Sequence, residues 1–100
     1  MSEVATVLNR AADLLEQDGW TQGKMRDSNG CRCALGAMDR ALLDLHRGPA
    51  NLRINDLYVE TMLNLRREIG QNNIPIWNDT PGRTATEVIA ALRNAAKDAA

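Results

Sequence analysis

Aromatic residues and an excess of charge of either sign are what this sequence lacks most. Its 100 residues include no phenylalanine, and the aromatic residues are only Trp20, Tyr58 and Trp77. Each tryptophan, if buried, would supply a large share of the apolar area of the core. The formal net charge of −1 at pH 7 argues against electrostatic attraction to a polyanion or a strongly cationic partner. A chain of this length has room for one core, so we expect a single domain over residues 1–100.

Long apolar segments are also absent from the sequence. No run approaches the roughly 18 apolar residues of a membrane-spanning helix. The first residues do not combine a basic segment with an apolar one, as a secretory leader does. The sequence therefore predicts a cytoplasmic protein with no membrane association.

Cysteine is scarce, and its spacing fits neither a zinc site nor a disulfide. Cys31 and Cys33 are separated by one residue. A closed structural zinc site needs four ligands, and the only further soft ligand, His46, would lie about 20 Å from Cys33 along the same predicted helix. A disulfide between residues two apart would be strained. We predict two ordinary thiols, Cys33 buried and Cys31 in a loop, with no metal and no cofactor, while His46 suits the dipole at its helix C-terminus.

What the sequence does contain is apolar residues spaced three and four apart, which is typical of amphipathic helices. This spacing predicts an all-α fold, a single small domain of four helices around one core. Thr84 and Glu87 have the N-cap and N3 spacing of a capping box. The helices are expected over residues 2–17, over 33–46, from Asn55 or Asp56 to Ile69, and onward from Thr84 with a frayed tail after Lys97.

The connection from Ile74 to Thr84 is rich in residues that fix the backbone. Thr80-Pro81-Gly82-Arg83 has proline and glycine at the positions that a type II turn requires. Asn78 and Asp79 are expected to fold their side chains back onto nearby backbone amides, as in an Asx-turn. Because binding residues are often found on loops of fixed shape, this connection is the first candidate for a site.

A glycine lies inside the second predicted helix. Gly36 costs that helix about 1 kcal/mol relative to alanine. Its neighbours Ala34 and Ala37 also have small side chains, so this helix offers a smooth surface. We expect a bulky group to approach it closely, and Trp20 or Trp77 is the natural candidate.

Three segments of the chain stand out together. They are Trp20-Thr21-Gln22-Gly23, then Cys33-Ala34-Leu35-Gly36-Ala37, then Ile76-Trp77-Asn78-Asp79 followed by Pro81-Gly82-Arg83-Thr84. Together they resemble a family of small uncharacterised proteins found in actinobacteria and their phages, grouped as a domain of unknown function. The resemblance covers most of the chain and implies an actinobacterial or phage source. It carries no known activity, so it assigns no catalytic residue.

No combination of residues in the sequence points to catalysis. An activated nucleophile, a metal-ligand set and a phosphate-binding loop are all missing from the pattern, so we expect a non-enzymatic protein. Trp and Arg are enriched at the energetic centres of interfaces, which favours a protein-interaction module. The partner is unknown, and would be a host protein, met in the host cytoplasm, if a phage encodes the chain. The predicted partner-binding residues are Trp20, Arg26, Trp77, Asn78, Asp79 and Arg83.

Two other functions stay open on the sequence alone. A DNA-binding accessory protein would use the second and third helices as a helix-turn-helix. Their connection over residues 47–54 is longer than usual, and the third helix starts with the acidic Asp56 where a recognition helix meets phosphates. A self-associating structural domain would instead form a homodimer by burying surplus apolar residues of the third helix. That helix has a stripe of Tyr58, Met62, Leu65 and Ile69, broadened by Val59 and Leu63.

Overall fold

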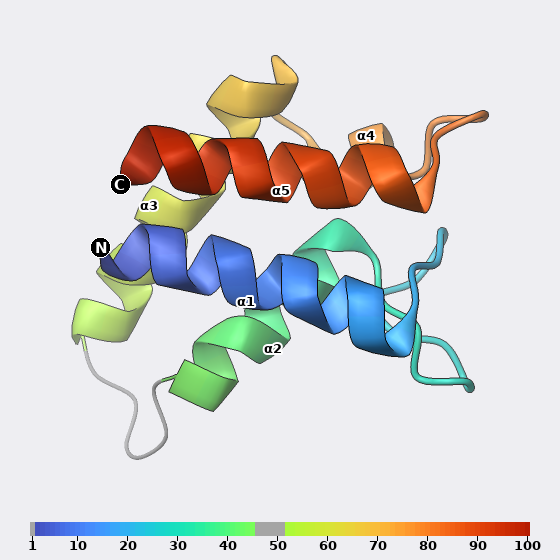
Figure 1. The fold of residues 1–100 in the computed structure, drawn as a ribbon, viewed down its shortest axis with the longest axis horizontal. Helices are drawn as coiled ribbons and strands as arrows, with labels where there is room; N and C mark the ends of the chain where they lie inside the picture. The colour runs from blue at the N-terminus through green and yellow to red at the C-terminus, as the bar shows by residue number, and fades with distance from the viewer. Residues whose placement is uncertain (1, 46–51) are drawn as a thin grey trace.

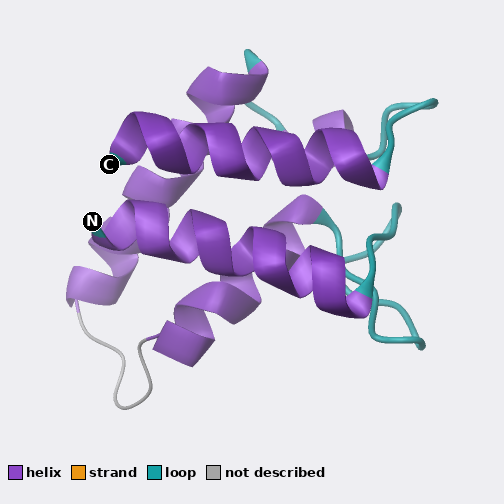
Figure 2. Ribbon diagram, in the orientation of Figure 1, coloured by secondary structure: helices purple, strands orange, loops and turns teal. Residues whose placement is uncertain are grey.

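Five helices make up the fold in the computed structural model, which describes residues 2–45 and 52–100. They are α1 (Glu3–Asp18), α2 (Ala34–Leu45), α3 (Leu52–Ile69), α4 (Ile74–Asn78) and α5 (Ala85–Ala99). Figure 2 shows helices joined by loops, with no strand in the described part of the chain. The predicted all-α fold is confirmed. Besides the four predicted helices, the structure contains one short helix, α4, that was not predicted.

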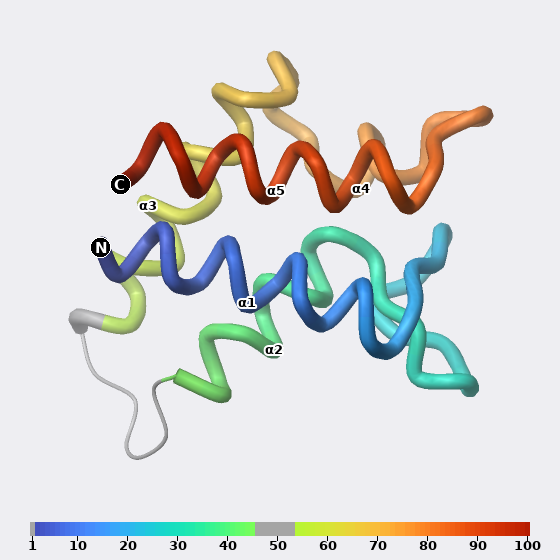
Figure 3. The backbone as a smooth tube through the Cα atoms, viewed as in Figure 1, coloured from blue at the N-terminus to red at the C-terminus, as the bar shows by residue number. Residues whose placement is uncertain are grey.

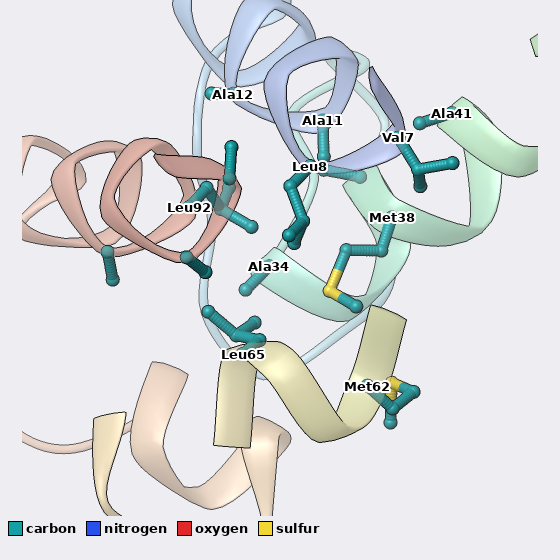
Figure 4. Packing of buried hydrophobic residues seen from close by; sticks show 14 of the residues in the cluster. Val7, Leu8, Ala11, Ala12, Ala34, Met38, Ala41, Met62, Leu65 and Leu92 are labelled. Atoms are coloured by element: carbon teal, nitrogen blue, oxygen red, sulfur yellow. The ribbon is translucent and has the colours of Figure 1, made fainter. Parts of the chain in front are cut away.

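The long helices are arranged around α1. Figure 1 shows α1 and α5 side by side and antiparallel, with α2 and α3 behind them. Leu8 of α1, Met38 of α2, Leu65 of α3 and Leu92 of α5 are fully buried and fill the space between these helices (Figure 4). Buried alanines on α1, α2 and α5 let the helices approach closely, since interaxial distance follows side-chain size.

The beginning of α3 differs from the predicted one. The helix begins at Leu52, so Asn55 and Asp56, each predicted to cap it, lie inside its first turns. The expectation for His46 falls within residues 46–51, which lie outside the described part of the chain.

The last helix begins as predicted but ends later. The Thr84 hydroxyl oxygen accepts a hydrogen bond from the Glu87 N–H at 3.2 Å, which is the N-cap contact that the sequence indicates. The predicted fraying after Lys97 is wrong. The helix continues to Ala99, which packs against the core, and the Ser2 hydroxyl donates to the Ala99 carbonyl oxygen at 2.8 Å.

The short helix α4 occupies the start of the connection that the sequence predicts to be a loop. The Asn73 side chain caps it by accepting a hydrogen bond from the Ile76 N–H at 3.0 Å, and Pro75 lies in its first turn. Both residues are typical of helix starts. Five residues are too few to establish a helical period, so periodicity could not reveal α4.

Gly36 is approached by backbone rather than by a tryptophan. A Cβ at this position would collide with the carbonyl oxygen of Met25 and lie 2.9 Å from its carbonyl carbon. The prediction of a close approach is therefore confirmed. The predicted approaching group, Trp20 or Trp77, is wrong, because the backbone of Met25 lies there instead. Only glycine leaves room for this main-chain contact.

Both cysteines are free thiols, with Cys33 buried and Cys31 partly exposed in the preceding loop, as predicted. Among the described residues, no group of three or more His, Cys, Asp and Glu side chains is placed to hold a metal ion. Within the same residues, no helix combines the length and the apolar character needed to cross a bilayer.

Candidate interaction surface

The loop between α1 and α2, residues 19–33, is called the first loop and is held in shape by its own backbone. Gly19 ends α1 with a φ of 97°, and its N–H donates to the Leu15 carbonyl oxygen at 3.1 Å. The Thr21 N–H donates to Arg32 O, and the Arg32 N–H donates to Gly19 O, both at 3.0 Å. These bonds join the two ends of the loop.

The tip of the first loop is closed by a side chain. Asp27 Oδ1 accepts hydrogen bonds from the N–H groups of Asn29 and Cys31, both at 2.9 Å. This is Asx-turn geometry. The Asx-turn predicted at Asn78 and Asp79 is wrong, because their side chains bond to residues 20–34 rather than to nearby backbone amides. The first loop is thus closed by its own turn at Asp27. The side chains of Asn78 and Asp79 make longer-range contacts.

Asn78, at the end of α4, joins three segments that are distant in sequence. Its Oδ1 accepts from Trp20 Nε1 at 2.6 Å and from the Ala34 N–H at 3.0 Å. Its Nδ2 donates to the Thr21 carbonyl oxygen at 3.1 Å and to Asp79 Oδ1 at 3.0 Å. The carboxamide thus uses both of its N–H donors and makes two acceptor contacts, in a side chain that is 0% exposed. It also satisfies the first amide of α2, which has no partner within that helix.

Further bonds connect the first loop to the end of α4 and to residues 79–84, which are called the second loop. Gln22 Nε2 donates to the carbonyl oxygens of Asn78 at 3.0 Å and Thr80 at 3.2 Å. Asp79 Oδ1 accepts from the Gly23 N–H at 2.9 Å. The hydrogen bond from Asn78, followed by that from Gly23, holds the pKa of Asp79 below its usual value. The carboxylate is therefore ionised at neutral pH in the form that this contact requires.

Arg83 packs the second loop onto α4. Its guanidinium carbon lies 4.3 Å from the centroid of the Trp77 ring, a cation–π arrangement, and its Nε donates to Trp77 O at 3.1 Å. The Arg83 N–H also donates to Thr80 O at 3.0 Å, with Gly82 at a φ of 86°. Both features agree with the predicted type II turn.

The surface over these contacts combines a small hollow with exposed apolar side chains. The hollow has a volume of about 250 Å³. Met25, on its wall, is 44% exposed, and Ile76, next to Pro75 of the wall, is 59% exposed. Its lining residues are Gly23, Lys24, Met25, Cys33, Pro75 and Asp79. The hollow thus lies between the first loop, α4 and Asp79.

The six residues predicted to bind a partner divide into two groups by exposure. Arg26 and Asp79 are exposed, and Trp20 and Arg83 are partly exposed. Trp77 is only 7% exposed and Asn78 is completely buried, so both lie beneath the surface and support it. Hydrogen bonds join Trp20, Asn78 and Asp79, and a ring contact with a hydrogen bond joins Trp77 to Arg83. Arg26 lies further along the first loop and has neither kind of contact with the other five.

Sequence reasoning did not single out several residues that shape this surface. Gln22 and Asp27 fix the loops, Met25 lines the hollow, and Ile76 is exposed next to Pro75 of its wall. Asp27, followed closely by Asn29 and Gly30, carries a recognisable turn signal. Nothing in the spacing of Met25 and Ile76 indicates that they lie near the same hollow.

A second hollow, of about 520 Å³, lies where α1, the first loop and α2 meet, and arginines line it. Arg10 and Arg40 both pair with Asp44, at 3.3 and 3.0 Å, and Arg32 pairs with Asp18 at 3.1 Å. Carboxylates of the same chain therefore already engage these guanidinium groups.

Comparison with known proteins identifies the family of the chain. The model of DUF6197, a family of unknown function, matches residues 1–98, and the chain belongs to this family. No curated protein and no solved structure matches the chain.

Proposed function

We propose that this member of the DUF6197 family is a non-enzymatic protein-interaction module. Its partner binds the loop surface, which we define as the exposed parts of the first loop, α4 and the second loop. The observation that supports this proposal most is the Asn78 carboxamide, which connects all three segments from a buried position. A buried side chain that bonds to several segments holds them in fixed relative positions, and so fixes the shape of the surface that they form.

Rigidity matters because ordering a loop during binding costs free energy. A surface that is already in its bound conformation avoids part of that cost. The first loop has its own Asx-turn at Asp27, and Gln22 and Asp79 connect it to the second loop. The loop surface is thus preorganised for association.

The distribution of side chains also suits a protein partner. Met25 and Ile76 expose apolar area at and beside the hollow, and Lys24 and Asp79, which line it, supply exposed charges. An apolar centre with a polar rim is the usual anatomy of a protein–protein interface. The hollow, at about 250 Å³, suits one apolar side chain of the partner.

The predicted site residues have two roles in this proposal. Trp20, Arg26, Asp79 and Arg83 contribute exposed atoms for contact. Trp77 and Asn78 hold those atoms in position, Trp77 through the Arg83 guanidinium and Asn78 through the Trp20 indole.

The setting of the interaction is a further part of the proposal. The resemblance to actinobacterial and phage proteins supports such a source and a cytoplasmic location. For a phage-encoded chain, the partner would be a host protein. DNA binding has less support, because Asp56 and Glu60 are exposed in the N-terminal half of α3, where a recognition helix would meet phosphates.

The test compares the wild-type chain with a Met25→Glu/Ile76→Glu variant in affinity capture from actinobacterial lysate. Captured proteins are identified by mass spectrometry, and each is then purified and titrated against the chain by calorimetry. The variant should bind the specific partner at least about tenfold more weakly, because charge is placed in an apolar interface centre.

A matched control is Leu43→Glu on α2, since Leu43 is 58% exposed and lies outside the loop surface. It should bind as the wild type does. Equal partner affinity for all three chains would contradict the proposed surface. Salt-sensitive binding of labelled DNA, with no protein partner, would replace the proposal with the nucleic-acid alternative.

A further inference from the structure

We propose that α3 also mediates a weak, antiparallel homodimer of this chain. The first observation is an apolar pair on the outward face of α3. Val59 is 54% exposed and Leu63 is 44% exposed, and they lie one helical turn apart. The core-facing side of the helix is formed by Leu57, Thr61, Met62 and Leu65, all buried. With 3.6 residues per turn, Val59 and Leu63 lie opposite that side.

The second observation is a separation of charge along the same helix. Asp56 and Glu60 lie in the N-terminal half, where they border a hollow with Glu3 of α1. Arg66 and Arg67 lie in the last turn. Glu68 follows Leu65 by three residues, which places it toward the buried side of the helix. Along the outward face, Asp56 therefore comes first, Val59 and Leu63 lie in the middle with Glu60 beside them at the edge that borders the hollow, and Arg67 comes last.

This face is complementary to itself in only one of two directions. A two-fold axis level with Thr61 places Val59 of one copy opposite Leu63 of the other. It also places Asp56 of each copy within about one residue, or 1.5 Å of rise, of Arg67 in the other copy. A parallel arrangement would instead set Asp56 against Asp56 and Arg67 against Arg67. Charge complementarity thus selects the antiparallel, isologous pair.

The area of this face of α3 determines how strongly the two copies are expected to associate. α3 has 18 residues, so it is about 27 Å long, and a face about 10 Å wide covers roughly 270 Å² per copy. A standard stable interface buries about 800 Å² per partner. The dimer should therefore be reversible and populated only at high protein concentration. The residues involved do not belong to the loop surface, so this inference does not depend on the proposed function.

The experiment is sedimentation equilibrium on the full chain, from micromolar to millimolar protein. The wild type should show a reversible monomer–dimer equilibrium. Leu63→Glu and Asp56→Arg should each lower the association constant about tenfold or more, the second by setting two arginines against each other in both halves of the dimer. The exchange Asp56→Arg/Arg67→Asp should restore association, because it reverses both members of each pair.

Matched controls are Leu43→Glu and Asp39→Arg, which make the same changes at exposed positions of α2. Both should associate as the wild type does, and circular dichroism should show all variants folded. A wild type that stays monomeric at millimolar concentration would overturn the proposal. An association that Leu43→Glu weakens as much as Leu63→Glu does would also overturn it. Failure of the double exchange to restore association would rule out the antiparallel pairing.

Discussion

At the scale of single residues, Asn78 is the side chain whose chemistry is hardest to replace. Aspartate would lack the two N–H donors that bind Thr21 O and Asp79 Oδ1. Leucine has a similar shape but no polar atoms at all. Both substitutions therefore leave the Thr21 carbonyl oxygen without the Asn78 donor. Leucine also leaves Trp20 Nε1 and the Ala34 N–H without their acceptor.

We expect Asn78→Leu to lower the free energy of unfolding by about 3 kcal/mol, since each buried polar group left unpaired costs about 1–3 kcal/mol. Urea unfolding followed by circular dichroism measures this loss. Asn94→Leu, at an exposed position of α5, is the control and should change stability by less than about 0.5 kcal/mol. Equal costs for the two variants would mean that the Asn78 contacts do not stabilise the fold.

The Asn78 contacts could not have been predicted from the sequence. The residues that it joins are 44 to 58 positions away, and an asparagine before Asp79 looks the same whether it forms a local turn or a long-range bond. Local signals did identify the Thr84 cap and the Pro81-Gly82 turn, because in both cases the interacting groups lie within three residues of one another.

At the scale of elements, the sequence predicts the four long helices because each of them buries one side. The apolar residues of that side recur at helical spacing in the sequence. The same reasoning missed α4, which is shorter than two turns. It also ended α5 too early, since the contact between Ser2 and Ala99 is made by the two ends of the chain. Boundaries set by tertiary contacts carry no local signal.

The packing of α2 against the first loop gives a prediction at this scale. In an ordinary helix, Gly→Ala stabilises by about 1 kcal/mol. Gly36→Ala should instead destabilise the protein by about 1–3 kcal/mol, because the new methyl group meets the Met25 carbonyl group, and backbone cannot move aside as a flexible side chain can.

Thermal unfolding of Gly36→Ala beside Asp39→Ala, an exposed position of the same helix, measures this effect. Tm should fall for the first variant and stay nearly constant for the second. A higher Tm for Gly36→Ala would mean that helix propensity outweighs the collision and that the first loop can shift away from α2.

At the scale of the whole molecule, α1 and α5 are joined by polar contacts as well as by the core. Arg93 of α5 donates to Asp13 at 2.6 Å, to Glu16 at 3.0 Å and to the Asn9 carbonyl oxygen at 3.1 Å. The hydrogen bond to Asp13 is the largest of the effects that raise the pKa of Arg93, so the guanidinium stays charged throughout the accessible pH range. One side chain thus bridges three positions of the neighbouring helix.

We expect Arg93→Gln to lower the free energy of unfolding by about 1–2 kcal/mol, less than for a buried network because the side chains are partly exposed. The difference from wild type should shrink as salt is added. Urea titrations at low and high salt measure both effects. Arg40→Gln removes an arginine paired within one helix and should cost no more than about 0.5 kcal/mol. A salt-independent loss for Arg93→Gln would point to packing rather than charge.

The hydrogen bond between Ser2 and Ala99 has a consequence for how the molecule can be anchored. It brings both ends of the chain to one place, and Figure 3 shows the two loops at the opposite end of α1 and α5. α1, at 16 residues, separates the two by about 24 Å. A tether attached at either end, whether a neighbouring segment, a fusion partner or a solid support, therefore leaves the loop surface pointing outward. Two copies fixed side by side by their ends would present that surface in the same direction, so immobilised protein is a suitable form in which to measure multivalent binding.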